Sequence, residues 1–448
     1  MISTRSNGKV AVALVAAVAL GLTGCSSGSP DSGSPAANGS QDAVDAALKQ
    51  GGEITYWTWT PQAEEQVAAF QQEHPNVKVK LENVGTGNDH YTKLQNAIKA
   101  GSGAPDVAQV EYQAMPQFAL TDALVDLNQY GFGAFEKDYT ASTWASSKVG
   151  DGLFGLPQDS GPMALFYNKQ VFDQYGLTVP KTWDEYLAAA RKLHTADPAR
   201  YLAADNGDAG FTTSMIWQAG GRPFNTDGRS VTINMADPGV KKWTSVWNQL
   251  LSEKLMAQIP PWTEEWYRAL GNGTIATAPT GAWWPGVLAS SVAEGAGKWA
   301  VAPMPSYDGQ PVTAESGGSA QSVLKQSKNP ALGAAFVRWL NNSRSSIKIF
   351  LDTGGFPATT ADLGSAEFRD KPSEYFAGQK INQVLTAAAG QVAKGWTYLP
   401  YQLYANSIYP DTVGKSYLNG SNIDAGLMDW QKALVDYGNQ QGFSVKAG

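Results

Sequence analysis

Short runs of apolar residues alternate along the chain with longer stretches in which apolar residues recur at helical spacing. Residues 53–59 are β-branched and aromatic, residues 77–81 alternate between apolar and polar, and residues 106–110 are mostly apolar, so each run predicts a strand. The stretches 61–73 and 89–100 carry apolar residues three or four positions apart, which predicts amphipathic helices. Strand, helix, strand, helix, strand is typical of an open parallel sheet, and the predicted fold class is therefore α/β.

Residues that start and stop helices flank several of these stretches. We expect Thr60 to cap the first helix and Pro61 to be its first residue. Gly101 is expected to end the second helix, because glycine accepts the left-handed backbone found there. Further along the chain, Thr182 and Glu185 have the spacing of a capping box, which predicts the start of another helix.

The first fifty residues differ from the rest of the chain. The apolar run 10–22 is too short to span a bilayer and ends in small residues, so residues 1–24 are predicted to be a signal peptide. Leu22–Gly24 followed by Cys25 resembles the bacterial lipobox, in which this cysteine is lipidated; an ordinary signal peptide with an unrelated cysteine is the alternative. Residues 25–50 are then the lipidated cysteine and a flexible tether.

Composition excludes several classes of function. Cys25 is the only cysteine among 448 residues, so with a lipid on it the mature chain has no disulfide, thiolate nucleophile or zinc–cysteine site. The net charge is −7 and no basic stripe occurs, which argues against nucleic acid as a partner. The length and the hydrophobic content of 43% suggest two domains. The aromatic count is high, with 15 Trp and 18 Tyr.

No coherent catalytic, cofactor or metal motif is found in the sequence. Gly150–Gly155 matches the dinucleotide fingerprint, but Leu156–Pro157 follows and prevents a helix from starting there, so a tight turn is expected. Asp205–Asp208 lacks the remaining ligands of a calcium loop and is interpreted as a polar turn. Asp184–Glu185 and Glu264–Glu265 are interpreted as helix starts or solvated faces. A glycoside hydrolase needs only two carboxylates, so that class stays open.

Aromatic and acidic residues stand at the ends of predicted strands, where α/β proteins bind ligands. Trp57 and Trp59 end the first strand on one face, so one is expected to pack under the helices while the other faces a cleft. Glu111 ends the third strand, and Trp283–Trp284 lie in a Gly/Pro loop. Flat apolar rings beside carboxylates suit a sugar, which presents C–H faces and a rim of hydroxyl groups.

A set of motifs along the chain resembles a known family, extracellular solute-binding family 1, the maltose-binding-like proteins. The resemblance extends over essentially the whole mature chain, and the Tyr-Asn-Lys and Pro-Lys-Thr-Trp motifs are its most specific parts. The segments that carry it are Pro105–Tyr112, Leu124–Leu127, Gly155–Pro157, Leu165–Lys169, Pro180–Glu185, Trp217–Gly221, Gly281–Trp284, Val301–Pro305, Gly317–Gly318 and Gly354–Pro357.

The resemblance implies a two-lobed, type II periplasmic-binding-protein fold with a ligand cleft between the lobes. The chain would cross between lobes near 156–161, 305–309 and Phe356. One lobe would hold 51–158 and 308–356, and the other 159–307 and 357–448. The family pattern places sugar contacts at Trp59, Glu111, Asp159, Trp217, Trp283, Trp284, Gly318, Phe356, Trp396, Tyr398 and Tyr401. For Trp217 and Trp284 a place in the core is the alternative.

The same resemblance implies the function. The protein would be a monomeric lipoprotein on the extracellular face of the cell membrane, anchored through Cys25, with no cofactor and no metal. It would bind a sugar or oligosaccharide by closing its two lobes around it and deliver it to the permease of an ABC importer. A secreted carbohydrate-active enzyme and a protein-binding surface lipoprotein are the alternatives. The identity of the sugar does not follow from the resemblance.

Overall fold

The computed structural model describes residues 41–205, 207–419 and 422–448. The predicted signal peptide, the lipidation site Cys25 and residues 25–40 of the predicted tether lie outside the described residues. Residues 41–50 do not fit the prediction of a tether, because they form helix α1 (Gln41–Gln50), packed on α12 (Pro330–Asn342). Val44 is fully buried and Asp45 pairs with Arg338 at 2.6 Å, so one apolar face and one ion pair hold the helix in place.

The first sheet has the strand order β2-β1-β3-β12-β6. Strands β1 (Gly52–Trp57), β2 (Val77–Glu82) and β3 (Val107–Glu111) are parallel, as the pattern predicts. β12 (Ser319–Val323) adds to β3 in antiparallel orientation, and β6 (Leu156–Pro157) adds to β12 in the same way. The predicted parallel sheet is therefore extended on one side by strands from distant parts of the chain.

Helices α2 (Ala63–Glu73) and α3 (Gly87–Ala100) connect the parallel strands. The predicted start of α2 is wrong, because Thr60 and Pro61 precede the helix in a turn. The Thr60 hydroxyl pairs instead with that of Thr58 at 3.1 Å. The predicted end of α3 is confirmed, since Gly101 has φ 67°. The remaining elements of this part are α4 (Met115–Leu120), η1 (Leu127–Tyr130), η2 (Phe132–Asp138), α5 (Ala141–Ser146), β4 (Lys148–Val149), β5 (Gly152–Leu153) and α13 (Arg344–Asp352).

The capping box at the start of α7 (Trp183–Ala196) is present in part. Thr182 Oγ1 accepts a hydrogen bond from the backbone N–H of Glu185 at 3.2 Å, as predicted. The Glu185 carboxylate reaches back to the backbone N–H of Lys181 at 2.7 Å, one residue before the expected partner. The glycine-rich Gly150–Gly155 segment forms the turn of the β4–β5 hairpin, so no dinucleotide fingerprint is present there.

The second part of the chain contains two smaller sheets. β7 (Met163–Asn168) lies between β10 (Thr277–Gly281) and β11 (Trp299–Ala302), antiparallel to both. β9 (Ser230–Ile233) lies between β8 (Phe224–Asp227) and β13 (Ser444–Ala447). The other elements are α6 (Lys169–Gln174), α8 (Ala209–Gln218), α9 (Pro238–Ser252), α10 (Glu264–Gly271), α11 (Trp284–Ser291), η3 (Ala293–Gly295), α14 (Thr360–Gly364), α15 (Ala366–Arg369), α16 (Ile381–Ala389), α17 (Gln402–Ile408), the π-helix η4 (Pro410–Gly414), α18 (Lys415–Asn419) and α19 (Ile423–Gln440).

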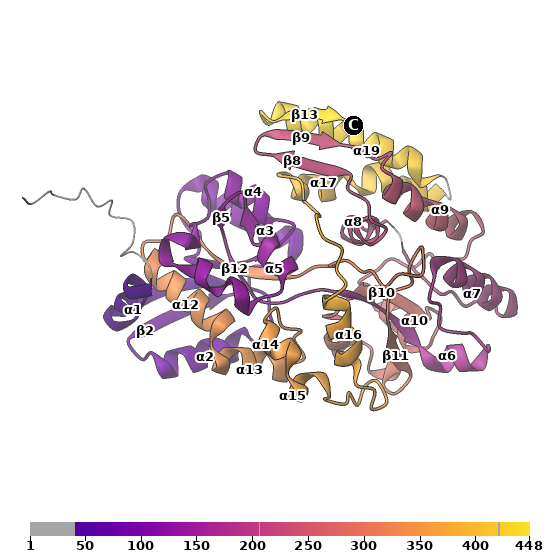
Figure 1. Cartoon of the computed structure of the whole chain (residues 1–448), viewed down its shortest axis with the longest axis horizontal. Coiled ribbons are helices and arrows are strands. Elements are labelled where there is room, and N and C mark those ends of the chain that lie inside the picture. The colour runs from indigo at the N-terminus through magenta and orange to yellow at the C-terminus, as the bar shows by residue number, and fades with distance from the viewer. Residues whose placement is uncertain (1–40, 206, 420–421) are drawn as a thin grey trace, which may run out of the picture. The chain divides into compact units, whose positions relative to one another are not determined.

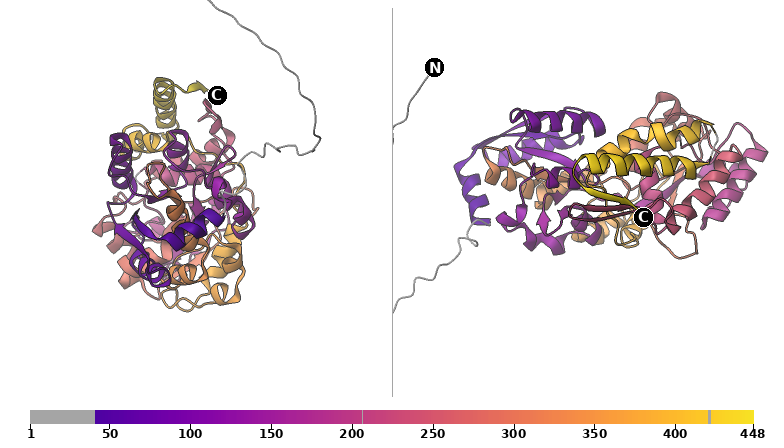
Figure 2. Two further views of the ribbon diagram at one scale, coloured as in Figure 1. Left: turned by 90° about the vertical axis from the view of Figure 1, so that its left-hand side faces the viewer. Right: turned by 90° about the horizontal axis from the view of Figure 1, so that it is seen from above.

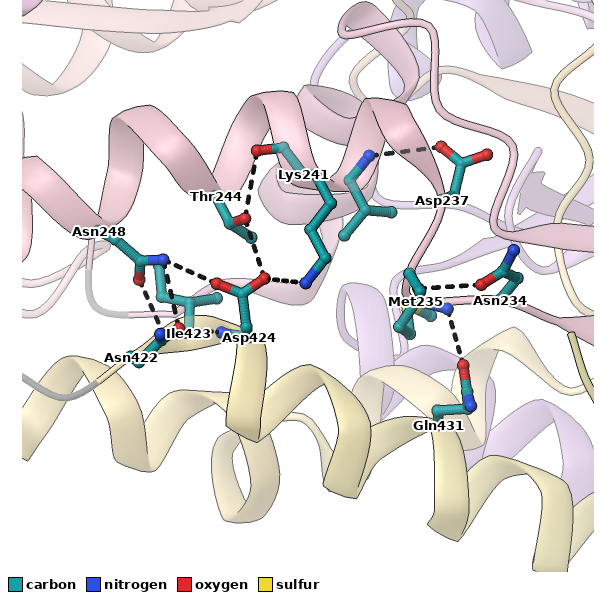
Figure 3. Close-up of polar contacts among 12 residues, drawn as sticks. Asn234, Met235, Asp237, Lys241, Thr244, Asn248, Asn422, Ile423, Asp424 and Gln431 are labelled. Carbon is teal, nitrogen blue, oxygen red and sulfur yellow. Dashed lines mark hydrogen bonds and ion pairs between the residues drawn. The ribbon is translucent and has the colours of Figure 1, made fainter.

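A polar network fastens the C-terminal helix α19 to α9 (Figure 3). The Asp424 carboxylate pairs with Lys241 and accepts hydrogen bonds from Thr244 Oγ1 at 3.2 Å and Asn248 Nδ2 at 2.9 Å. These donors lower the pKa of Asp424, although burial acts in the opposite direction. Gln431 accepts from the backbone N–H of Met235 at 2.7 Å. The C-terminal segment is thereby held against the second part of the chain.

The two groups of elements lie on opposite sides in Figure 1, with α1, α2, α12 and β2 on one side and α6, α7 and α9 on the other; Figure 2 shows the same separation from above. Two isolated bridges, Asp159 with Pro357 and Pro162 with Glu315, join three segments of the chain that are distant in sequence. Ser306 still pairs with Lys181 in the second part. We therefore propose that the second crossing lies at 314–318 and not at 305–309.

The lobe boundaries otherwise stay a prediction. The described residues belong to one compact unit. Four apolar clusters fill this unit, two associated with the first sheet and two with the second part. None of the helices in the described ranges has both the length and the apolar character that crossing a membrane requires.

Candidate functional site: an aromatic cleft between two groups of strands

A cleft of about 1170 Å³ is lined by residues from both parts of the chain. Its walls carry Trp59, Glu111 and Gly318 from the first sheet, and Trp262 and Trp283 from the second part. Ligand pockets of drug-sized molecules typically have roughly 300–1,000 Å³, so this volume is large enough for a ligand of several rings.

Trp59 supplies the aromatic ring on the side of the first sheet. Trp57 is 7% exposed and donates its indole N–H to Glu82 at 2.8 Å, whereas Trp59 is half-buried and lines the cleft. The expectation that one of the pair packs inward is confirmed. His90 meets the Trp59 ring edge-on, with 4.9 Å between ring centroids. Burial lowers the pKa of His90 to about 4, so the imidazole behind Trp59 is neutral at physiological pH.

Two carboxylates meet beside the end of β3. Register pairs Glu111 with Ser319, and Ser319 donates its N–H and hydroxyl to Asp159 Oδ1 at 2.7 and 2.9 Å. Burial raises the pKa of Asp159 to about 6, with the Ser319 donors acting in the opposite direction. Burial also raises the pKa of Glu111, and Asp159 adds to the rise. The strand pairing thus gathers two predicted site residues that are 48 positions apart in sequence.

Gly318 is a position where only glycine fits. Its φ is +93°, and a Cβ there would lie 2.7 Å from the ring of Tyr112. The Tyr112 backbone N–H donates to Gly318 O at 3.1 Å, and the Tyr112 hydroxyl donates to Asp159 O at 2.8 Å. Tyr112 therefore connects Gly318 and Asp159 through its backbone N–H and its hydroxyl group.

Four tryptophans form the wall on the opposite side. Trp283 is half-buried and faces the cleft, with its ring 6.0 Å from that of Trp262 and 5.7 Å from that of Trp284. Trp284, in contrast, is 1% exposed, and Trp266 is 8% exposed. Trp284 also borders the cleft, although nearly all of its side chain is buried at the N-terminus of α11. Its contact with a ligand stays a prediction.

Two further carboxylates come from the second part of the chain. Asp205 accepts from the Trp247 indole N–H and the Gly207 backbone N–H, both at 2.9 Å, and burial raises its pKa to about 6. Asp208 is exposed and caps α8 by accepting from the Phe211 backbone N–H at 2.6 Å. No cluster of His, Cys, Asp and Glu suited to a metal is found among the described residues.

The remaining predicted sugar contacts fall into two groups, those that line or border the cleft and those that do not. Tyr398 lines the cleft, and Phe356 borders it but is only 3% exposed. Trp217, Trp396 and Tyr401 are absent from the cleft lining. Trp217 is 4% exposed and stacks on Trp396 at 5.3 Å with 6° between the rings. Their predicted place in the cleft is therefore wrong.

The packing of α8 explains the inward position of Trp217. This helix is buried on nearly every side, so Trp217 faces the core and donates its indole N–H to the backbone oxygen of Ala393 at 2.5 Å. Tyr401 is 3% exposed and belongs to the same apolar cluster. A match to a family motif does not reveal which side of a buried helix a ring occupies.

All the charged side chains among the described residues that line the cleft are acidic. The described residues that line it include Glu111, Asp159, Asp205 and Asp208, and none of them is Lys, Arg or His. Amide side chains add donors and acceptors. Gln109 accepts from Thr58 Oγ1 at 2.6 Å and donates to Ser319 Oγ at 3.0 Å. Such a surface suits an uncharged, hydroxyl-rich molecule with apolar faces.

Sequence reasoning missed several residues of this site. Trp262 lies in a loop before α10, and Asp205 and Asp208 were assigned to a plain turn. Gln113 and Asn406 also line the cleft and bridge its two sides, because Asn406 Nδ2 donates to Gln113 Oε1 at 3.0 Å. The Pro-Pro-Trp sequence ahead of Thr263 was the one local signal for Trp262.

Comparison with known families identifies the frame around this cleft. The family model described as bacterial extracellular solute-binding protein matches residues 56–345, which include the strands that border the cleft except the first four residues of β1. The chain belongs to this family. Residues 346–448 follow the matched segment, and they include Phe356 and Tyr398 at the cleft and α19.

Two relatives of this solute-binding protein are named for the sugars that they bind, and another was solved with a sugar. The ABC transporter associated binding protein from B. animalis subsp. lactis Bl-04, solved with β-1,6-galactobiose, is 42% identical; the alignment covers 88% of this chain and 99% of that one, with a TM-score of 0.82. The galacto-N-biose-/lacto-N-biose I-binding protein from Bifidobacterium longum is 28% identical, covering 89% and 99%, with a TM-score of 0.79. The arabinooligosaccharide-binding protein of Bacillus subtilis is 28% identical over 72% of this chain and 78% of its own.

These likenesses confirm the predicted family and the two-lobed fold class. They also bear on the question of an enzyme, because the relatives are binding proteins. The individual sugar contacts stay a prediction.

Proposed function

We propose that this solute-binding protein captures a neutral oligosaccharide in the cleft and delivers it unaltered to the permease of an ABC importer. One observation carries the proposal. Trp59 and Trp283 lie on opposite sides of a cleft whose described lining holds four carboxylates and no cationic side chain. Indole rings suit the C–H faces of a pyranose, and carboxylates accept hydrogen bonds from its hydroxyl groups. The sugar ligands of the relatives in the comparisons support the same class.

The mechanism that we propose is closure of the two lobes around the sugar. We place the connections between the lobes at 157–162, 314–318 and 356–358. Glu315, in the second of these segments, accepts a hydrogen bond from the Gly161 backbone N–H in the first at 2.6 Å. A sugar that touches Trp59 and Trp283 together favours the closed arrangement by its difference in affinity. Converting a mostly open population to a mostly closed one takes about 5.5 kcal/mol of such difference.

The contacts available in the cleft can supply a difference in affinity of this size between the closed and open forms. Each stacked ring contributes about 0.5–1.5 kcal/mol beyond area burial, and hydrogen bonds to charged acceptors about 1.5–3 kcal/mol each. Two rings and two carboxylates together contribute about 4–9 kcal/mol, a range that includes 5.5 kcal/mol, and only the contacts that form on closure add to the difference. The Asn406–Gln113 hydrogen bond adds a direct link between the sides of the cleft.

We also propose that the protein acts as a monomer on the extracellular face of the membrane, held by a lipid on Cys25. The family is extracellular by description, and the only cysteine follows a lipobox-like Leu22–Gly24. Two acyl chains give a stable anchor, since each buried methylene contributes about 0.8 kcal/mol. Cys25→Ser should release the protein from the membrane fraction; continued sedimentation with membranes would contradict the anchor.

A thermal-shift panel followed by calorimetry tests the proposal. The panel contains β-1,6-galactobiose, lacto-N-biose, lactose, arabino-oligosaccharides and maltose. We expect a rise in Tm with at least one of them and a one-to-one stoichiometry. Chromatography of the recovered sugar distinguishes the alternatives, because a binding protein returns it intact and a glycoside hydrolase cleaves it. No response to any neutral oligosaccharide would contradict the proposed function and leave a protein partner as the alternative.

A further inference from the structure

Trp262 is an unusual feature of the cleft wall. Its side chain is 54% exposed, which makes it the one largely exposed tryptophan in the described part of the chain. It nevertheless lines the cleft. An exposed indole is a large apolar surface in contact with water, and such a surface at the mouth of a pocket commonly marks a contact with a partner or ligand.

The loop that carries Trp262 is rigid. Pro260 and Pro261 precede it, and the φ angles of both are restricted by their rings. Thr263 then donates its hydroxyl to Pro260 O at 2.8 Å and caps α10 by accepting from the Trp266 backbone N–H at 3.2 Å. These constraints hold the backbone of Trp262 in place before any ligand arrives.

The backbone of Trp262 is also strained. Its φ is +65°, in the left-handed region that bulky residues rarely occupy. Strained residues of this kind persist where their surroundings impose them, and they are frequent at ligand clamps. Glycine would adopt the same conformation without strain. A residue chosen only for the turn would therefore be glycine, and the presence of tryptophan indicates a use for its ring.

The Trp262 ring lies beside the Trp283 ring in a stacked, offset arrangement. The two ring centroids are 6.0 Å apart and the planes are inclined by only 29°. Trp266 supports the Trp262 ring from the buried side at 5.3 Å. The cleft therefore carries two neighbouring indoles of similar orientation on one wall, the half-buried Trp283 and the exposed Trp262.

We propose that Trp262 forms a second stacking subsite, which holds the sugar ring next to the one on Trp283. This inference rests on the proposed function, because it requires the ligand to be a saccharide. The rigid loop presents the indole without an entropic cost of ordering on binding. The second subsite makes the protein prefer a disaccharide or longer chain to the corresponding monosaccharide.

Calorimetry with two sugars and two variants tests the subsite. The sugars are β-1,6-galactobiose and galactose, or the disaccharide of the panel that binds in place of galactobiose and its monosaccharide unit. Trp262→Gly removes the ring and relieves the strained backbone, so its Tm should equal or exceed that of the wild type. Its affinity for the disaccharide should fall about 10-fold, whereas its affinity for the monosaccharide should change less than about 2-fold. Trp262→Phe, which retains a ring, should recover most of the loss.

The outcomes separate the subsite from a structural role. An unchanged disaccharide affinity in Trp262→Gly would overturn the proposal, and so would equal losses for both sugars. Trp266→Phe alters the buried neighbour of Trp262 and leaves the exposed ring in place; if it reproduced the selective loss, the effect would come from core packing. Wild-type protein that binds no sugar of the panel would count against the proposed function, whereas normal binding in Trp262→Gly would count against the subsite alone.

Discussion

The indole N–H of Trp283 donates a hydrogen bond to the backbone carbonyl oxygen of Ser316 at 2.7 Å. Trp283 belongs to the tryptophan wall, and Ser316 follows Glu315, which forms an isolated bridge with Pro162. Gly317 leaves room for the ring, because a Cβ there would be 3.1 Å from the indole nitrogen. This hydrogen bond therefore fixes the orientation of the Trp283 ring relative to the backbone at Ser316.

Two substitutions of Trp283 distinguish the contribution of ring stacking from that of the hydrogen bond to Ser316. Trp283→Ala removes both, and we expect the affinity for a bound oligosaccharide to fall 10-fold or more, as for a loss of about 1.4 kcal/mol. Trp283→Phe keeps a ring and loses the N–H, so its affinity should lie between those of Ala and wild type. Calorimetry measures both. An unchanged affinity in Trp283→Ala would remove Trp283 from the site.

The acidic lining predicts discrimination against anionic sugars. We expect a disaccharide that carries a carboxylate in place of its terminal primary alcohol to bind at least 10-fold more weakly than the neutral form. Two like charges roughly 6 Å apart repel by about 3 kcal/mol at an effective dielectric constant of 20. Competition calorimetry at pH 7.5 measures the ratio. Glu111→Gln should reduce that ratio, and Asp122→Asn, a surface change at an exposed ion pair with Lys325, should not. Equal affinity for both forms would contradict the role of the carboxylates.

Glu315 predicts a pH dependence of stability. Its carboxylate is 1% exposed and accepts from Ser142 Oγ at 2.8 Å, Ser160 Oγ at 3.1 Å and the Gly161 N–H at 2.6 Å. Burial raises its pKa to about 7, so the folded state binds the proton more tightly than the unfolded state does. The resulting stability is fully present below the unfolded pKa of about 4.3 and is lost as the pH rises through 7.

The test is urea unfolding at pH 5 and pH 8. The wild type should lose up to about 3 kcal/mol of unfolding free energy over this range from Glu315 alone. The Glu315→Gln variant should lose less unfolding free energy between pH 5 and pH 8. Part of the pH dependence should remain in this variant, because Asp159 and Asp205 have pKa values of about 6. An identical pH slope in Glu315→Gln and wild type would show that Glu315 does not titrate in this range.

Tyr401 offers a test of the corrected site. Its hydroxyl is buried and has no hydrogen-bond partner among the described residues. Tyr401→Phe removes an unsatisfied polar group, so the unfolding free energy should stay equal or rise by about 1 kcal/mol. Sugar affinity should stay within about 2-fold of wild type, as calorimetry can show. A loss of affinity with unchanged stability would indicate that Tyr401 contacts the sugar, as the family resemblance implies.

Local patterns predicted the first sheet well, because alternation and helical spacing are set by which face of each element is buried. Val67 and Phe70 face inward on α2, and Gly101 ends α3 with the left-handed backbone for which glycine is suited. The expected start of α2 is wrong because Thr60 bonds to Thr58 rather than to the helix. Thr58 in turn donates to Gln109 of β3, a contact between residues distant in sequence. The pairing of β12 with β3 depends on residues more than 200 positions apart and has no local signal.

The candidate site was predictable where strand ends determine it. Glu111 and Trp59 follow strands, and the structure places both at the cleft. Trp217 matches the family motifs equally well but is buried in the core, because the burial of a ring is decided by what packs on it. Trp262 escaped prediction since its exposure results from a strained loop, and strain is visible only in the backbone angles.

A crystal structure of the protein with the oligosaccharide that gives the largest thermal shift tests the central claim most directly. We predict a sugar ring with its C–H face on the indole of Trp283, with Trp59 on the opposite side, and with hydroxyl groups donating to Glu111 or Asp159. A sugar bound outside the cleft, or a complex in which both indoles are covered by protein side chains, would contradict the account.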